Sequence, residues 1–188
     1  MKFLSYQRAG QTGIGLLTRN HDTFVDLTRA APGNGGAGPF SSMLSLIDAG
    51  PGVLDDVGRI ASQAEQTGGQ LETLSQLETL SNVQLLPPLP EPRQMRDANN
   101  FPVHIDFSAR DTQIQEMQSM MGPAKGKSFD GSNVIGPWLV TKDEVPNPRS
   151  LTMSVRVNGE VWSTGNSSDM PYSFEDMIAD VSRSEALR

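Results

Sequence analysis

The chain has 188 residues, and its 15 Lys and Arg residues against 22 Asp and Glu residues give a formal net charge of −7. This acidic balance argues against nucleic acid as a partner, and the apolar runs are too short to span a bilayer. The sequence contains no cysteine, which excludes a disulfide framework, a thiol nucleophile and a cysteine-ligated zinc. Because the first residues also turn polar too early for a signal peptide, we expect a cytoplasmic protein.

The N-terminal region, residues 1–85, is predicted to begin with strands. Over residues 1–30, short apolar stretches alternate with Gly and with an Asn-His-Asp run, which is typical of strands joined by tight turns. A Gly-rich loop is expected over residues 32–39. The run Gly10-Gln-Thr-Gly13-Ile-Gly15 lacks the lysine of a phosphate-binding loop, so we interpret it as a turn between strands.

A helical segment is expected over residues 40–81. Apolar residues recur at helical spacing over residues 40–66, and Gly50-Pro51-Gly52 divides this stretch into two helices. A direct repeat of Gln-Leu-Glu-Thr-Leu-Ser fills residues 70–81. Two copies are too few for a solenoid, so the repeat is interpreted as a connecting segment.

The second domain, residues 86–188, opens with a Pro-rich stretch that we interpret as a rigid connector and not as a ligand of proline-binding modules. Three strands are predicted, over Trp138–Val140, Ser150–Val157 and Glu160–Thr164, the last two joined by an Asn-Gly hairpin turn. An amphipathic helix follows over Tyr172–Ser184, with a capping box formed by Ser173 and Asp176. The predicted fold class is therefore mainly β with a few helices (α+β).

The densest polar cluster lies between His104 and Asp130. If the chain is helical here, Asp106, Arg110 and Gln113 fall on one face and point a carboxylate, a guanidinium and an amide into one space. The simpler alternative is a solvated face with an ion pair between Asp106 and Arg110. His104 can likewise be a structural histidine, and the Lys-Gly-Lys run at residues 125–127 an exposed basic turn.

The order of motifs in this half resembles that of the fumarylacetoacetate hydrolase family. The likeness rests on Arg96-Asp97, His104, Asp106-Phe-Ser-Ala-Arg-Asp-x-Gln113, Gly126-Lys127-Ser-Phe-Asp130 and Gly136-Pro-Trp-Leu-Val140. It continues through Pro146-Asn-Pro148, Val157-Asn-Gly-Glu160 and Gly165-Asn-Ser-Ser-Asp-Met170. The resemblance is close from residue 86 onward and looser over residues 1–30, and residues 32–83 carry no motif of the family.

The resemblance implies a fold, a site and an assembly. The family has a mixed β-sandwich roll with a small β-rich N-terminal region, and its members are usually homodimers with a divalent metal in each site. The matching positions imply metal binding by Asp97 and Asp106. They imply catalytic roles for His104, Arg110, Gln113 and Lys127. Mg²⁺ is the metal expected at such an all-oxygen site, and Mn²⁺ or Ca²⁺ are alternatives.

The activity implied is hydrolysis of a C–C bond adjacent to a carbonyl in a small oxo-acid of the fumarylacetoacetate or acylpyruvate type. In this chemistry the metal, Arg110 and Lys127 would receive the charge of an enolate, while His104 takes a proton from water. Decarboxylation, hydration and isomerisation of 2-oxo acids are alternatives within the family. A catalytically inactive binding or structural relative is another alternative, and a carbohydrate-binding β-sandwich is less favoured because aromatic side chains are few.

The sequence also departs from the family pattern. The family's metal site uses a Glu-x-Glu pair between the histidine and the Asp-Phe-Ser-Ala-Arg-Asp segment, and no Glu-x-Glu occurs in this sequence. A stretch of the family pattern is absent between Ile105 and Asp106, and the Pro-Gly-Asp and Gly-Thr motifs expected after Arg188 are absent too. Either the sequence joins two stretches of a longer chain, or the protein carries a true internal deletion. The position of the junction between two motifs favours the first explanation.

Overall fold

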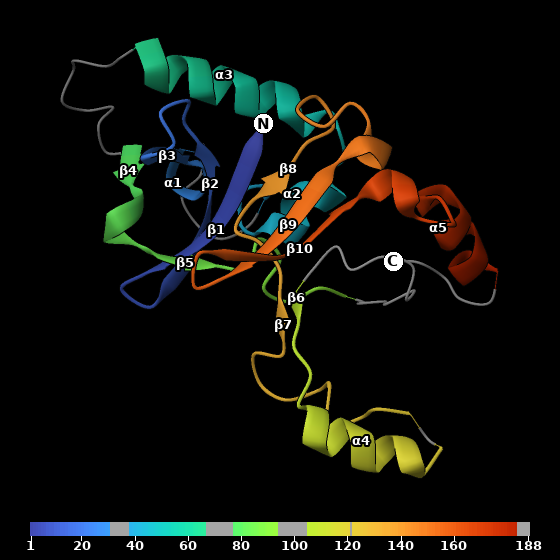
Figure 1. Ribbon diagram of the computed structural model, residues 1–188. Helices are drawn as coiled ribbons and strands as arrows, with labels where there is room; N and C mark the ends of the chain where they lie inside the picture. Colours follow the sequence, from blue (N-terminus) through green and yellow to red (C-terminus); the bar gives the residue numbers. More distant parts are fainter. Residues whose placement is uncertain (31–37, 67–76, 94–104, 121, 184–188) are drawn as a thin grey trace. The chain divides into compact units, whose positions relative to one another are not determined.

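The structure is a computed structural model, and it describes residues 1–30, 38–66, 77–93, 105–120 and 122–183 (Figure 1). The chain divides into two compact units, which are described separately. The first unit consists of Met1–Pro92 together with Ile135–Glu144. The second consists of Arg93–Val134 together with Val145–Arg188.

The first unit is built on a six-stranded antiparallel sheet in the order β4-β3-β2-β1-β5, with β8 also paired to β1. Its strands are β1 (Lys2–Arg8), β2 (Gln11–Leu17), β3 (Thr23–Asp26), β4 (Leu77–Thr79), β5 (Gln84–Leu86) and β8 (Leu139–Val140). A tight turn joins β1 to β2, and both of its central residues, Ala9 and Gly10, have positive φ values. Such a turn matches the twist of the two strands that it connects.

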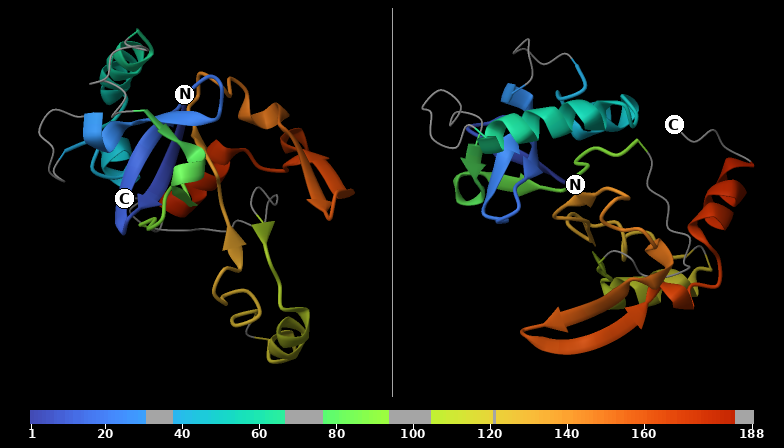
Figure 2. Two further views of the ribbon diagram at one scale, coloured as in Figure 1. Left: turned by 90° about the vertical axis from the view of Figure 1, so that its left-hand side faces the viewer. Right: turned by 90° about the horizontal axis from the view of Figure 1, so that it is seen from above.

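The two faces of this sheet bury different side chains, because successive residues of a strand point to opposite sides. One face packs Phe3, Ile14 and Val25 against helices α2 (Met43–Asp48) and α3 (Val53–Gln66). The other face buries Leu4, Tyr6, Leu17 and Phe24, with Leu80, Val83 and Trp138 packed against them. Figure 2 shows α3 lying along one side of the sheet. The core of the first unit therefore has two layers, one on each face.

The glycines that were expected in a turn lie mainly in strand β2. Gly13 and Gly15 are in the strand, and only Gly10 is in the turn. A Cβ atom on Gly13 would lie 2.6 Å from the ring of Tyr6, and one on Gly15 would lie 2.3 Å from the ring of Phe24. These glycines make room for aromatic rings, so the Gly-rich run serves packing and not phosphate binding.

The helical segment expected over residues 40–81 is only partly helical. Helices α2 and α3 confirm the two expected helices, and the side chain of Ser42 caps the first by accepting a hydrogen bond from the backbone N–H of Ser45. The end of the segment differs, since residues 77–79 form strand β4 and Leu80–Asn82 form a 3₁₀ turn. Pairing of β4 with β3 supplies hydrogen bonds that the local leucine spacing does not reveal.

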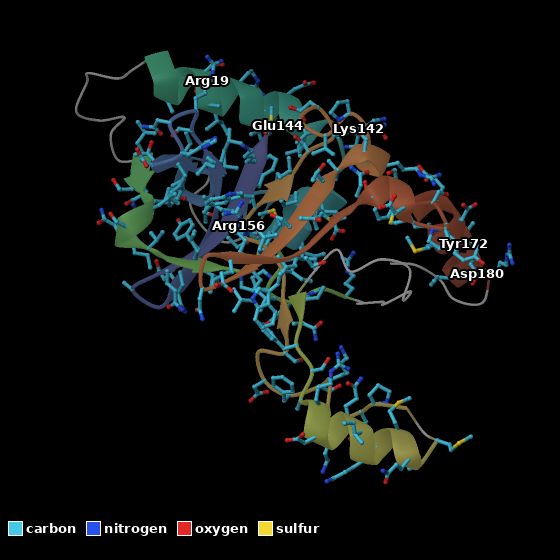
Figure 3. The ribbon with its side chains drawn as sticks, in the orientation of Figure 1. Arg19, Lys142, Glu144, Arg156, Tyr172 and Asp180 are labelled. Atoms are coloured by element: carbon cyan, nitrogen blue, oxygen red, sulfur yellow. The ribbon has the colours of Figure 1, made fainter. Side chains whose placement is uncertain are left out.

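The described residues of the second unit form two antiparallel strand pairs and two longer helices. Strand β6 (Ile105–Asp106) pairs with β7 (Asn133–Val134), and β9 (Thr152–Val157) pairs with β10 (Glu160–Asn166). The helices are α4 (Arg110–Gln118) and α5 (Phe174–Ser182), and 3₁₀ turns lie at Pro148–Ser150 and Ser167–Asp169. In Figure 3, Arg156 lies on the β9–β10 hairpin, Tyr172 precedes α5 and Asp180 lies on it.

Two expected features of the second unit are confirmed. Asn158 and Gly159 turn the β9–β10 hairpin and both have positive φ values, as a two-residue turn requires. Ser173 and Asp176 form the expected capping box of α5, with both reciprocal hydrogen bonds present. With strands outnumbering the few helices among the described residues, the expectation of a mainly β fold with a few helices is confirmed.

Candidate active site

Residues 105–134, called the site segment below, close on themselves in the structure. At one end, β6 pairs with β7 through Ile105 opposite Val134 and Asp106 opposite Asn133. The backbone N–H of Phe107 extends this pairing by donating to the carbonyl of Ser132 over 2.7 Å. The two ends of the site segment are thereby joined, and α4 lies between them in the chain.

Helix α4 begins at Arg110, so the condition under which Asp106, Arg110 and Gln113 would share one helical face is not met. Asp106 lies in strand β6, while Arg110 and Gln113 share the first turn of α4. The guanidinium of Arg110 donates to Oε1 of Gln113 over 2.6 Å. This bond engages the amide oxygen of Gln113, and the NH₂ group is the part of that side chain that can donate a hydrogen bond.

The turn that carries Lys127 packs against the same helix. The carbonyl of Gly126 accepts a hydrogen bond from the backbone N–H of Ala109 over 2.9 Å. Gly126 is buried, and a Cβ atom added to it would lie 2.9 Å from Cα of Gln113. Only glycine allows this approach of the two backbones without a shift. Lys127 follows directly, and its backbone N–H donates to the carbonyl of Ala124 over 3.2 Å.

Glu116 is a functional candidate that the sequence analysis missed. Its carboxylate accepts hydrogen bonds from the backbone N–H groups of three consecutive residues, Ala124, Lys125 and Gly126. These bonds, that of Gly126 foremost, hold the pKa of the Glu116 carboxyl below its usual value. An acidic residue in the last turn of a helix interacts unfavourably with the helix dipole. The position of Glu116 near the end of α4 is therefore a sequence signal that its carboxylate has a partner outside the helix.

The structure thus brings four of the predicted site residues into one segment. Asp106 lies on β6, Arg110 and Gln113 on α4, and Lys127 on the turn packed against α4. The other two, Asp97 and His104, lie outside the described residues.

The predicted metal ligands, Asp97 and Asp106, are both carboxylates, and their oxygen atoms suit a hard divalent cation. The oxygen donors of these two residues fit such an ion, but two carboxylates alone do not fill the ligand positions of a hard divalent cation, which number about six or more. Among the residues that the structure describes, no group of three or more His, Cys, Asp or Glu side chains is placed to hold a metal.

The first unit has surface cavities, and they differ in character from the site segment. One, of about 490 Å³, is lined by the cationic Lys2 and Arg19 and by His21, together with the acidic Asp143 and Glu144. Figure 3 labels Arg19 and Glu144. The Met1 ammonium group, which also lines this cavity, pairs with Asp143 and Glu144. A second cavity, of about 280 Å³, lies beside β1, β2 and α2, and neither cavity is lined by a predicted site residue.

None of the helices within the described residues has the length and apolar character that a membrane span requires.

The second half of the chain is similar to known proteins. Residues 100–188 match the family described as Fumarylacetoacetate (FAA) hydrolase C-terminal. The mitochondrial oxaloacetate tautomerase FAHD2A of Homo sapiens is 43% identical over 89 residues, which cover 47% of this chain and 28% of that protein. Maleylpyruvate hydrolase of Aquipseudomonas alcaligenes is 31% identical over 90 residues, covering 48% of this chain and 29% of that protein. The chain thus spans less than a third of the length of these relatives.

A solved structure shares the fold. A hexagonal crystal form of 2-keto-3-deoxyarabinonate dehydratase matches with a TM-score of 0.50 at 15% sequence identity, over 98% of this chain and 84% of that one. At this identity the likeness concerns the fold alone, and it agrees with the expected roll of the fumarylacetoacetate hydrolase type. The family match includes the whole site segment with its Asp106, Arg110, Gln113 and Lys127. The motifs, the fold and these relatives agree in showing that residues 100–188 are similar to the C-terminal domain of the fumarylacetoacetate hydrolase family.

Proposed function

We propose that this protein is a metal-dependent hydrolase that cleaves a C–C bond adjacent to a carbonyl in a small oxo-acid. The observation that carries the proposal is the site segment. Within the stretch that matches the family, it joins the Arg110–Gln113 pair to the Gly126–Lys127 turn by direct backbone contact. Two cations and a neutral amide in one segment suit an anionic, oxygen-rich substrate.

Each residue has a distinct role in this proposal. Arg110 and Lys127 bind the carboxylate of the oxo-acid and stabilise the enolate that forms when the C–C bond breaks. The NH₂ group of Gln113, whose Oε1 is already engaged by Arg110, donates to a carbonyl oxygen and orients it. His104 accepts a proton from water as the water oxygen forms a bond to the carbonyl carbon. The C–C bond then breaks, its electron pair becomes that of the enolate, and the proton held by His104 passes to the enolate carbon.

A divalent cation, most suitably Mg²⁺ and alternatively Mn²⁺ or Ca²⁺, would be held by Asp97 and Asp106 and would supply a Lewis acid for the substrate oxygens. Asp106→Ala should weaken the binding of Mn²⁺ measured by isothermal titration, with Asp111→Ala, at an exposed position on α4, as the control. Equal Mn²⁺ affinity in Asp106→Ala and in the wild type would remove Asp106 from the ligand set.

A tautomerase or isomerase is the second candidate, and a specific observation favours it. The human oxaloacetate tautomerase is 43% identical over its matched stretch, against 31% for maleylpyruvate hydrolase. Enolate stabilisation by Arg110 and Lys127 serves both reactions, which differ in whether water attacks. Decarboxylation and hydration of 2-oxo acids share the same intermediate charge. An inactive relative is the remaining alternative, and the missing Glu-x-Glu is its support.

An assay of two substrates separates these candidates. We would supply Mg²⁺ and follow the cleavage of an acylpyruvate and the enol–keto conversion of oxaloacetate by ultraviolet absorbance. Cleavage supports the hydrolase, and conversion of oxaloacetate alone supports the tautomerase. Absence of both with metal bound supports the inactive relative.

Replacement of the proposed base gives the second part of this test. His104→Ala should lower kcat about 10²- to 10⁴-fold while the far-ultraviolet circular dichroism stays unchanged. His21→Ala is the matched control, because His21 is the other histidine of the chain and lies in the first unit. Full activity in His104→Ala would show that another group is the base.

The proposal includes a cytoplasmic homodimer that binds neither nucleic acid nor membranes. The cysteine-free, acidic composition supports the compartment and the absence of nucleic acid. Light scattering of the purified chain tests the assembly, since a monomeric mass would contradict the homodimer.

A further inference from the structure

The carboxylate of Glu116 gathers three neighbouring backbone amides. Oε1 accepts from Lys125 over 2.7 Å, and Oε2 accepts from Ala124 and from Gly126, each over 2.9 Å. Hydrogen bonds from N–H groups to an ionised acceptor are stronger than those between neutral groups. Three consecutive amides that converge on one anion also define the backbone conformation of the turn that carries them.

This arrangement connects the two parts of the proposed binding site. Glu116 lies on α4 one turn after Gln113, and the turn that it binds ends directly at Lys127. A second contact, from the Ala109 N–H to the Gly126 carbonyl, holds the same turn to the start of α4. The backbone position of Lys127 relative to Arg110 and Gln113 therefore depends on Glu116 and on the Ala109–Gly126 bond.

Packing alone does not hold the turn in place. In the site segment, Ile114 is 58% exposed, Met117 54% and Phe129 41%. These apolar side chains are only about half buried, so their packing contributes less to ordering the turn than full burial would. The turn is therefore ordered mainly by its polar contacts, which are those of Glu116 and the Ala109–Gly126 hydrogen bond.

We propose that Glu116 is a positioning residue that holds the turn of residues 124–127 on α4, so that Lys127 acts together with Arg110 and Gln113 on the oxo-acid. The inference rests on the proposed function. Glu116 itself does not contact the substrate in this account, and its effect on the reaction passes through Lys127.

A double-variant cycle tests this coupling. Glu116→Gln keeps the size of the side chain but loses the charge and replaces one acceptor oxygen by an NH₂ group that cannot accept from an amide N–H. We expect kcat/KM for the oxo-acid to fall about 10- to 100-fold, as for other disturbances of a positioned group. In a Lys127→Ala background, the same Glu116→Gln change should lower kcat/KM less than 2-fold, because residues that act as a unit are not additive.

The matched control is Gln115→Ala, on the adjacent, exposed position of α4, which should leave kcat/KM within 2-fold of wild type. Glu116→Asp keeps the charge one methylene shorter, and it should recover more of kcat/KM than Glu116→Ala does. Additive effects of Glu116→Gln and Lys127→Ala would overturn the positioning role and leave only a structural one.

Amide hydrogen exchange gives a readout that does not depend on activity. The amides of residues 124–126 should exchange at least 10-fold faster in Glu116→Gln than in the wild type and in Gln115→Ala. Unchanged exchange would overturn the inference whatever the kinetics. A different result would be a wild type that is inactive on every oxo-acid, together with faster exchange in Glu116→Gln. That result would overturn the proposed function, and with it the role of Glu116 in that reaction. The hydrogen bonds of Glu116 to residues 124–126 would still be supported.

Discussion

The first unit and the site segment are stabilised in different ways. The first unit buries Phe24 and Leu4 completely within its two-faced sheet, whereas Ile114 and Met117 of the site segment are more than half exposed. The site segment is held instead by the β6–β7 pairing and by the hydrogen bonds of Glu116 to the turn before Lys127. Apolar burial provides stability, while directed polar contacts provide geometry. The difference implies that mutations in the two regions have different consequences, on unfolding in one and on turnover in the other.

The largest expected effect on stability is that of Phe24→Ala. This ring is fully buried against Gly15 and packs on Tyr6 with ring centroids 5.0 Å apart. Removing it should cost about 3–5 kcal/mol in the free energy of unfolding. Phe129→Ala in the site segment, where the ring is 41% exposed, should cost less than about 1 kcal/mol. Urea unfolding followed by circular dichroism measures both, and equal losses would remove the contrast between the two regions.

The next effect is that of Tyr6→Phe, which tests a buried polar pair in the same core. The Tyr6 hydroxyl donates to Oδ2 of the fully buried Asp26 over 2.6 Å. Without it Asp26 loses a donor, at a cost of about 1–3 kcal/mol. Tyr172→Phe, at an exposed ring, should change the unfolding free energy by less than about 0.5 kcal/mol. A loss of the same size in both variants would contradict the role given to burial.

The same pair predicts a pH dependence. Burial, followed by the hydrogen bond to Asp26, raises the pKa of Tyr6 above its ordinary value. Because the pKa of Tyr6 is higher in the folded state, the protonated hydroxyl stabilises the fold fully below about pH 10, where the tyrosine of the unfolded chain is also protonated. This contribution to the free energy of unfolding is lost as the pH rises through the pKa of Tyr6 in the folded state. Unfolding measured from neutral to alkaline pH should show a steeper loss in the wild type than in Tyr6→Phe.

In the site segment, Gly126→Ala should affect turnover more than stability. The added Cβ would meet the backbone of Gln113 at 2.9 Å, and neither side can move without separating the turn from α4. We expect a destabilisation of about 1–2 kcal/mol and a fall of about 10-fold or more in kcat/KM. Gly52→Ala in the first unit has open space around the new atom and should leave kcat/KM unchanged. Unimpaired turnover in Gly126→Ala would show that the contact of the turn with α4 is dispensable.

The smallest effect is expected at α5, which lies in the second unit but outside the site segment. Ser173→Ala removes the capping box and should cost about 0.5–2 kcal/mol without changing kcat/KM. The Ser173 hydroxyl and backbone N–H hold the pKa of Asp176 below its usual value. The contribution of this carboxylate to the helix is therefore present above about pH 4 and is lost as the pH falls through the lowered pKa. Circular dichroism during acid titration should show less change in Ser173→Ala than in the wild type.

The sequence was sufficient where a local rule determines the structure. The Asn158–Gly159 turn follows from the need for positive φ at two adjacent residues, and the start of α5 follows from the spacing of Ser173 and Asp176. Helices α2 and α3 follow from apolar periodicity interrupted at Gly50. In each case the determining residues lie within a few positions of one another.

It was insufficient where partners distant in the sequence determine the structure. Strand β4 exists because Thr23 and Thr79 become neighbours, and the six-residue repeat that contains β4 indicates no such partner. The spacing of Asp106 from Arg110 is compatible with a shared helix, but pairing with Asn133 makes the segment of Asp106 a strand. Glu116 was missed because its three partners lie eight to ten residues away, beyond the reach of any helical spacing rule.

Strand β8 has a consequence for how this chain can be divided. The β8 residues Leu139 and Val140 pair with the first strand of the chain, and segment 135–144 belongs to the first unit although it lies between two stretches of the second. The backbone therefore passes from one unit to the other three times, and no single cut yields two intact pieces. A cut before residue 93 would put β8 in the C-terminal piece. In the N-terminal piece, the part of β1 that pairs with β8 would then be unpaired, and an unpaired strand edge is a site for aggregation. To transfer the second unit to another scaffold, residues 135–144 have to be replaced by a linker. Otherwise they have to be transferred together with β1, with which β8 pairs.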